Sequence, residues 1–463
     1  MQGQLVQTSN INNRENDGAS WILIALIALV LGTAFFVSEV DWHISTYENY
    51  SLEADDAEAL VATGSNTRKA IYATIGLLGG LLLLAASRQP RRLANPTMMF
   101  LATYVVMCCA SIAWSDDPIL SIKRVAVLGF CILGAIGVAK HLNALDLLKL
   151  TVVIAFFLVG MGVCTELALG TFKPFNGNYR FAGTVHPNTQ GAYCAVLAIA
   201  GFFGAKGPTR GRFVYLAALA LGIGLLLLTK SRASCAGCLF ALSAAWLLSS
   251  GRVARTFACV GGPLAVCLIL IASLLAGMEV TSELDRAARL GRSELESSVA
   301  GLNGRVPLWT HLMSHVSERP LLGYGYNGFW TPQRIYEISS EHEWTIATAH
   351  SVVIDVLLSV GMIGGLLFGI TFAMTLYQAG RRCLQTHAAG DTYVFALAMF
   401  AIVSGVFESG FAQPAGFDTF VVACGLFYVV MLRERCVADP SQPGNIAATR
   451  CHPLPVPYGV GSS

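Results

Sequence analysis

Charged residues are scarce in this chain. They make up 13% of its 463 residues, about half the roughly 25% of an average soluble domain. Hydrophobic residues make up 54%, and the mean hydropathy is +0.60. A soluble protein of this composition would expose large apolar patches, so the composition excludes a water-soluble enzyme. The formal net charge of +2 also excludes a general nucleic-acid-binding protein, which would need a basic excess.

Several familiar motifs are missing as well. The sequence contains no Gly-rich phosphate loop, no coiled-coil heptads and no repeat of fixed period. Most of its thirteen cysteines lie in apolar segments, and the Cys235 and Cys238 pair has no partner ligands nearby in the sequence. Cysteines in such surroundings pack as small buried hydrophobic residues. We therefore expect neither a disulfide framework nor a metal site.

Long apolar segments indicate an all-α, polytopic integral membrane protein with about 12 transmembrane helices. A helix needs roughly 20 apolar residues to cross the hydrocarbon core. The first segment follows a polar tail and has no small-residue cleavage site, so it is not a signal peptide. The expected spans are 20–38, 70–87, 97–114, 120–139, 149–169, 190–205, 213–229, 234–249, 256–276, 350–371, 391–408 and 418–432.

Basic residues gather in every second connection between these spans. Cytoplasmic loops are enriched in Lys and Arg, so both termini are expected in the cytoplasm. The inner side then has a net charge of about +10, and the outer side with the spans about −8. The basic residues of the inner connections are Arg88, Arg91, Arg92, Lys140, Lys206, Arg210, Arg212, Arg252, Arg255, Arg381, Arg382, Arg433 and Arg435.

This topology also predicts the organisation of the chain. Two outer segments are long: the acidic 39–68 and a loop of about seventy residues, 277–349, between spans nine and ten. The predicted parts are a cytoplasmic polar tail (1–19), spans one to nine (20–276) with the outer acidic loop 39–68, the large outer loop (277–349), spans ten to twelve (350–432) and a cytoplasmic tail (433–463).

The large outer loop contains recognisable elements. Residues 282–298 have helical composition, and 305–316 predict an amphipathic helix ended by Pro320. The Gly- and aromatic-rich run 323–330 indicates either a sugar-facing surface or packing of the loop on the membrane domain. The expected apolar side of the second helix consists of Val306, Trp309, Leu312, Met313 and Val316.

Basic residues on the outer side are exceptions to the charge pattern. A guanidinium at membrane depth is costly unless it is paired, so Arg180 and Arg232 are candidate binding residues. The alternative is that they extend to lipid headgroups. The full set is Lys123, Arg124, Lys173, Arg180, Lys230, Arg232, Arg305, Arg319 and Arg334.

One histidine stands at the mouth of the tenth expected span. His350 precedes Asp355 by five residues, and titratable groups at a membrane boundary are candidate functional residues. The alternative is a hydrogen-bonded structural histidine. Forked guanidinium groups match a diphosphate, and a neutral imidazole can act as a general base near pH 7. This set suits a substrate with a membrane-embedded lipid tail and a diphosphate, whose charge the arginines rather than a metal would neutralise.

Four motif stretches follow one another in order along the chain. With this topology they resemble the bacterial O-antigen ligase and polysaccharide polymerase superfamily, and Trp-Ser-Asp-Asp-Pro at 114–118 is a weaker further match. The run 318–330 resembles the exopolysaccharide-production branch more than the lipopolysaccharide ligases. The four stretches are 180–188 with Gly191; Ser231-Arg232; Gly304-Arg305 to Trp309 with Pro-Leu-Leu-Gly-Tyr-Gly at 320–325; and Ala349-His350-Ser351 with Gly361 and Gly364.

The resemblance implies a GT-C-like glycosyltransferase of the bacterial inner membrane, with its active site and the 277–349 loop facing the periplasm. It would move a glycan from undecaprenyl diphosphate to a sugar hydroxyl of a glycan or lipid A core acceptor, with no metal and no cofactor. The implied partners are this donor, the acceptor, membrane lipid and other polysaccharide-assembly proteins, and not nucleic acid.

The resemblance also assigns roles by motif position. His350 matches the general base, Arg232 and Arg305 the diphosphate-binding arginines, and Arg180 a supporting cation. The further supporting residues are His186, Asn188, Trp309 and Ser351. The superfamily usually has Asn where this chain has Ser351, and a serine cannot copy the donor and acceptor pair of an amide. The resemblance therefore does not fix the orientation of the His350 ring in this chain.

Two other classes fit part of the sequence. A transporter or flippase for lipid-linked sugars would explain the twelve spans, but transporters often show paired halves, and none is evident here. A non-catalytic assembly protein is the third reading. Within the enzyme class, ligase and polymerase share the donor and differ in the acceptor, so the sequence leaves that choice open, along with the sugar and the linkage.

Overall fold

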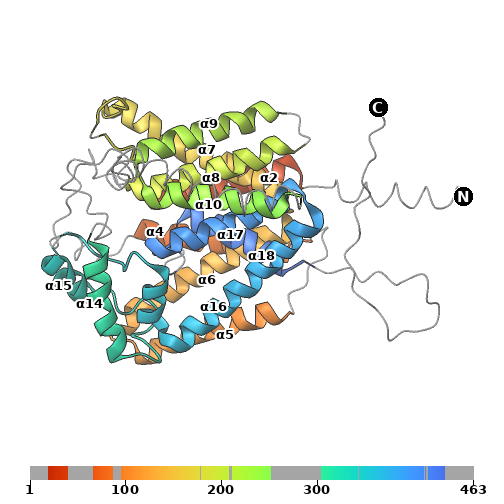
Figure 1. Cartoon of the computed structure of the whole chain (residues 1–463). Helices are drawn as coiled ribbons and strands as arrows, with labels where there is room; N and C mark the ends of the chain where they lie inside the picture. The colour runs from red at the N-terminus through yellow and green to blue at the C-terminus, as the bar shows by residue number, and fades with distance from the viewer. Residues whose placement is uncertain are drawn as a thin grey trace, which may run out of the picture.

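The computed structural model describes residues 19–39, 66–86, 95–177, 179–207, 211–251, 304–342, 344–410, 412 and 416–432. These residues form helices that lie alongside one another (Figure 1), as the all-α prediction required. In chain order they are α2 (Trp21–Glu39), α4 (Asn66–Leu84), α5 (Pro96–Ala110) with the 3₁₀ turn η2 (Ser111–Trp114), α6 (Pro118–His141), α7 (Ala144–Leu169), α8 (Pro187–Lys206), α9 (Arg212–Thr229), α10 (Arg232–Ser249), α14 (Arg305–Glu318), α15 (Pro332–His342), α16 (Val352–Thr386), α17 (Ala389–Phe407) and α18 (Phe417–Val430).

Among the described residues, nine helices are long and apolar enough to cross a membrane. They make the chain a multi-pass membrane protein. Two further expected spans coincide with helices: α8, which is buried along almost its whole length, and α18, which has 14 residues. The expected span 256–276 lies outside the described residues, so the number twelve stays a prediction.

Glycines allow neighbouring helices to approach closely, as small residues commonly do in membranes. A Cβ atom on Gly79 of α4 would lie 2.3 Å from the carbonyl oxygen of Leu133 on α6. A Cβ atom on Gly201 of α8 would lie 2.5 Å from the backbone nitrogen of Leu219 on α9. These helix pairs therefore pack backbone against backbone.

Contacts at the helix ends support the predicted up-and-down order. The backbone nitrogen of Ala19 donates to the carboxylate of Asp146 at 2.8 Å, and Arg382 pairs with Asp391 at 3.0 Å. All four residues belong to ends that the sequence assigns to the inner side. The ends assigned to the outer side meet one another in the candidate site. These contacts agree with the predicted alternation of the described helices, and the side that faces the cytoplasm stays a prediction.

Helix α16 is longer than the expected span 350–371 and is broken near its start. It has 35 residues and a non-helical residue at Gly361, with φ 64°. The outer-loop segment 320–325 fills the break. The backbone nitrogen of Met362 donates to Pro320 at 2.8 Å, and that of Tyr324 donates to Leu358 at 2.8 Å. Irregular backbone within a span is tolerated where protein satisfies it, so the 320–325 motif and Gly361 form one contact.

The described part of the outer loop, 304–342 and 344–349, forms a small helical cap at one end of the bundle, where α14 and α15 lie (Figure 1). The predicted 305–316 helix is confirmed as α14, but its apolar side is only partly as expected. Leu312 and Val316 are buried, whereas Val306 and Met313 are 42% and 43% exposed. Leu308 is buried in their place, because α14 packs against α16 with the face that contains Leu308. The stretch 282–298 lies outside the described residues.

The aromatic run of the loop serves packing rather than a sugar-facing surface. Tyr324, Tyr326, Phe329 and Trp330 are all buried. Trp330 also donates its indole N–H to Asp355 at 2.8 Å, which gives that carboxylate of α16 a structural partner. These contacts seat the cap on the membrane helices.

Three of the outer arginines attach the cap to the bundle. Asp116, in the 114–118 motif, accepts a hydrogen bond from Arg319 at 2.7 Å and another from Arg334 at 2.7 Å. Arg124 of α6 donates to the carbonyl oxygens of Asn327 and Trp330. These three cations therefore have structural partners.

Candidate functional site

The carboxylate of Glu408 is the meeting point of the candidate site. Its Oε1 accepts a hydrogen bond from Arg305 at 2.9 Å and one from the amide nitrogen of Asn188 at 3.1 Å. Its Oε2 lies 3.4 Å from Nδ1 of His350. Three residues singled out by the sequence motifs thus gather around one acid that the sequence analysis did not select.

Each of these residues stands at the end of a helix. Glu408 directly follows α17, and Arg305 is the first residue of α14. Asn188 lies in the first turn of α8. His350 precedes α16 with a left-handed backbone, φ 48°, which is uncommon for a residue other than glycine. The site is therefore assembled by packing of four helices.

The charges of the cluster complement one another. The side chains of Arg305, His350 and Glu408 are 15%, 25% and 29% exposed, so they are partly shielded yet accessible. Burial raises the pKa of Glu408, but the hydrogen bond and charge of His350 and the charge of Arg305 outweigh it. The net result is a pKa of Glu408 below the ordinary value. Glu408 is therefore ionised at neutral pH.

The surroundings of His350 fix its ring. The indole of Trp344 lies against it, with ring centroids 5.4 Å apart, and Trp309 donates to the carbonyl oxygen of Ala349 at 2.8 Å. Ser351 is buried as the N-cap of α16 without a side-chain capping bond. Because the carboxylate engages Nδ1, the proton is assigned to that nitrogen and Nε2 is left as the basic nitrogen.

Arg180 belongs to the same polar network. It donates to the side-chain oxygen of Asn188 at 3.2 Å and to the carbonyl oxygen of Thr229 at 3.1 Å. Its loop is held by Glu166 of α7, whose Oε1 accepts from the backbone nitrogens of Ala182 and Gly183 at 3.0 and 2.7 Å. Arg180 thus reaches Glu408 through a single residue, Asn188.

His186 has a capping role. Its Nδ1 accepts a hydrogen bond from the backbone nitrogen of Asn188 at 3.2 Å, which caps α8. Burial and the nearby positive charge of Arg180 lower the pKa of His186 to about 4. The ring is therefore neutral at pH 7 and adds no positive charge to the site.

Arg232 is the first residue of α10, directly after the turn whose Thr229 binds Arg180. Ser231 packs tightly against α8, since a Cβ atom on Gly191 would lie 2.8 Å from its Cβ. This close approach explains why the Arg180 and Ser231-Arg232 motifs occur together. The structure places Arg232 on the element next to the cluster, and its role in binding stays a prediction.

Glu408 and Glu166 were missed by the sequence analysis. Glu408 ends the expected span 391–408, and Glu166 lies near the outer end of 149–169. An acid at the outer end of a span, on the same side as the exceptional arginines, was the available signal. A lone glutamate has no spacing pattern that marks it as a ligand or a catalytic residue, so neither residue stands out in the sequence.

The helices and the polar cluster at their ends define a class: a multi-pass membrane protein with an arginine, histidine and glutamate site to which the outer cap contributes Arg305. Residues 217–369 match the family model described as O-Antigen ligase, a stretch that includes Arg232, Arg305 and His350. The chain is also 22% identical, over 384 residues, to the Exopolysaccharide production protein ExoQ of Rhizobium meliloti (strain 1021), with 78% of this chain and 82% of that protein covered. The resemblance to the O-antigen ligase and polysaccharide polymerase superfamily is thereby confirmed.

Proposed function

We propose that this protein is a glycosyltransferase of the bacterial inner membrane that moves a glycan from undecaprenyl diphosphate to an acceptor sugar hydroxyl at the periplasmic face. The observation that supports this most is the convergence of His350, Arg305 and Asn188 on Glu408. A base and a forked cation thereby lie within reach of one carboxylate, at the end of the bundle that the charge pattern assigns to the outside.

His350 is the proposed base. With Nδ1 held by Glu408, Nε2 takes the proton of the acceptor hydroxyl, and the carboxylate stabilises the imidazolium that forms, as in other carboxylate and histidine pairs. The acceptor oxygen attacks the anomeric carbon, and the bond from that carbon to the diphosphate oxygen breaks with its electron pair. Direct displacement inverts the anomeric centre.

The arginines are proposed to hold the leaving group. Undecaprenyl diphosphate gains negative charge as it departs, and preorganised donors aimed at such charge are often the largest catalytic contribution. Arg305 has five N–H donors, and its ion pair with Glu408 leaves some of them for phosphate oxygens. Arg232 and Arg180 would supply further positive charge, so this scheme assigns phosphate neutralisation to the chain's own cations.

The family model is described as O-Antigen ligase, but two other observations support a polymerase. The relative is named for exopolysaccharide production, and the 318–330 run resembles the same branch. We therefore propose that the acceptor is a growing glycan and that the product is a surface polysaccharide.

Deletion of the gene with complementation by the wild type and by His350→Ala tests this proposal. The expected result is accumulation of single lipid-linked repeat units at the periplasmic face and loss of long chains, restored by the wild type alone. Long chains that form but stay absent from lipid A core would indicate a ligase. Repeat units trapped at the cytoplasmic face would indicate a flippase, and unchanged glycans would refute the proposal.

A further inference from the structure

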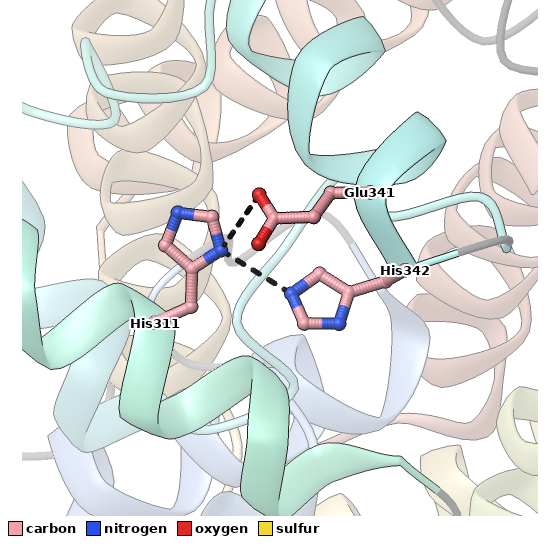
Figure 2. Close-up of side chains that lie close together, drawn as sticks. All are labelled: His311, Glu341 and His342. Atoms are coloured by element: carbon pink, nitrogen blue, oxygen red, sulfur yellow. Dashed lines mark hydrogen bonds and ion pairs between the residues drawn. The ribbon is translucent and has the colours of Figure 1, made fainter.

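A second polar cluster lies in the outer cap, apart from Glu408. It joins His311 of α14 to Glu341 and His342 at the end of α15 (Figure 2). Nδ1 of His311 lies 3.3 Å from Nε2 of His342 and 3.3 Å from Oε2 of Glu341. One ligand atom from each of the three residues lies within 4.8 Å of the other two.

We propose that His311, Glu341 and His342 form a Zn²⁺ site that ties α14 to α15. Zinc binds imidazole nitrogen and carboxylate oxygen at roughly 2.0–2.2 Å, and a tetrahedral arrangement then puts neighbouring ligand atoms roughly 3.3–3.5 Å apart. Two of the three separations in the cluster already match this spacing. Two imidazoles and a carboxylate are a ligand set that zinc accepts, with water at the fourth position.

The contacts of His311 also favour a cation over a simple hydrogen bond. The same nitrogen, Nδ1, faces both His342 and Glu341. One N–H serves two such partners only through a bifurcated bond, whereas an ion between the three residues bonds to each of them. The side chains of His311 and Glu341 are 24% and 63% exposed, so an ion can enter from solvent and the glutamate can adjust to it.

The position of the cluster suggests what the ion does. Trp344, which lies against the ring of His350, comes two residues after His342. Trp309 of α14 binds the carbonyl oxygen of Ala349 at 2.8 Å. An ion that joins α14 to α15 therefore restrains both tryptophans, Trp309 and Trp344, that contact Ala349 and His350. This role is structural, and the site stands independently of the proposed glycosyl transfer.

His315 provides a matched control on the same helix. Its ring stacks on that of His311 at 5.3 Å, and its Nδ1 faces Glu318 at 3.4 Å. It is therefore a nearby, partly exposed histidine outside the three-residue set. If zinc uptake were non-specific attraction to surface histidines, His315→Ala would weaken it as much as His311→Ala.

The experiment uses the full-length protein in nanodiscs, purified with a tag that contains no histidine and stripped of metal with a chelator. Titration with Zn²⁺, followed by calorimetry and elemental analysis, should show one ion per chain. His311→Ala, His342→Ala and the mild Glu341→Gln should each bind about tenfold more weakly or worse, while His315→Ala binds like the wild type. Zn²⁺ should raise the unfolding temperature of the wild type and of His315→Ala only.

Co²⁺ reports the geometry separately, because a tetrahedral site gives it strong visible absorption. The wild type should develop this band and His342→Ala should lack it. Substoichiometric zinc in the wild type, or equal affinity in all four variants, would overturn the proposal and leave the cluster as a hydrogen-bonded contact.

Discussion

The imidazole of His350 and the carboxylate of Glu408 lie 3.4 Å apart, although 58 residues separate them in the sequence. His350 precedes α16 and Glu408 follows α17, so their contact depends on how these two antiparallel helices pack. Since Arg305 binds the other oxygen of the same carboxylate, the outer cap joins the site only when it docks on the bundle. Docking of the cap therefore brings Arg305 to the carboxylate that also holds His350.

Replacing His350 by Ala should lower glycosyl transfer by about 10²–10⁴-fold, the usual contribution of a general base. Donor binding should be largely retained, because the arginines stay in place. Transfer is measured in proteoliposomes with a lipid-linked donor, and donor binding is measured separately on the same preparation.

His387 supplies a matched control for this substitution. It follows α16 as His350 precedes it, and both have φ 48°. Alanine therefore meets the same backbone strain at each position, and only the imidazole differs in its surroundings. Equal activity losses in His350→Ala and His387→Ala would show that strain, and not loss of a base, causes the effect.

Replacing Arg305 by Lys tests the forked geometry. Lysine keeps the charge that pairs with Glu408 but presents a single point charge in place of a planar fork. Transfer should fall by about 10²-fold, comparable to the loss of one charge-stabilising donor, with little change in unfolding temperature. Arg381→Lys, at an exposed residue near the far end of α16, is the control. Wild-type transfer by Arg305→Lys would argue against diphosphate binding by Arg305.

Much of the fold was predictable because its signals are local. Apolar length predicted the spans that coincide with described helices, whereas the span 256–276 lies outside the described residues and stays a prediction. Arg180, Arg305 and His350 were selected because a cation or imidazole at a membrane boundary needs a partner, and Asn188 because it belongs to a family motif. All four lie in the observed network.

The partners themselves could not be predicted, because they depend on packing between distant segments. Glu408 is an ordinary acid at the end of a span until α16 and α17 bring it to His350. The Cys235 and Cys238 pair illustrates the opposite case: its apolar context predicted burial, and Cys238 is buried while Cys235 is partly buried. Helix α16 extends to Thr386, beyond the end of its expected span at 371. Apolar residues alone do not mark where a helix ends.

The lowered pKa of Glu408 predicts a dependence of stability on pH. The folded-state pKa lies below the ordinary value of 4.5, so this group stabilises the fold fully above pH 4.5 and loses that effect as the pH falls through its folded pKa. The wild type should therefore unfold at a higher temperature than Glu408→Gln at pH 7, and the difference should shrink in acid. Thermal unfolding in nanodiscs between pH 7 and pH 4 measures it. A difference that stays constant with pH would mean that the carboxylate charge contributes nothing.

Replacing Gly361 by Ala should undock the cap from α16. The new Cβ would lie 2.3 Å from the backbone of Leu321, at a residue with φ 64°. Left-handed strain costs about 1–2 kcal/mol, and forcing atoms into a packed contact costs about 1–3 kcal/mol more.

The unfolding temperature and transfer should therefore both fall, because the 320–325 segment that fills the break helps to seat the cap carrying Arg305. Gly369→Ala is the control on the same helix, since a Cβ there meets nothing within 4 Å. Alanine also favours helix over glycine by about 1 kcal/mol, so this control should be as stable as the wild type or more so. If Gly361→Ala behaved like Gly369→Ala, the break in α16 would not be what holds the cap in place.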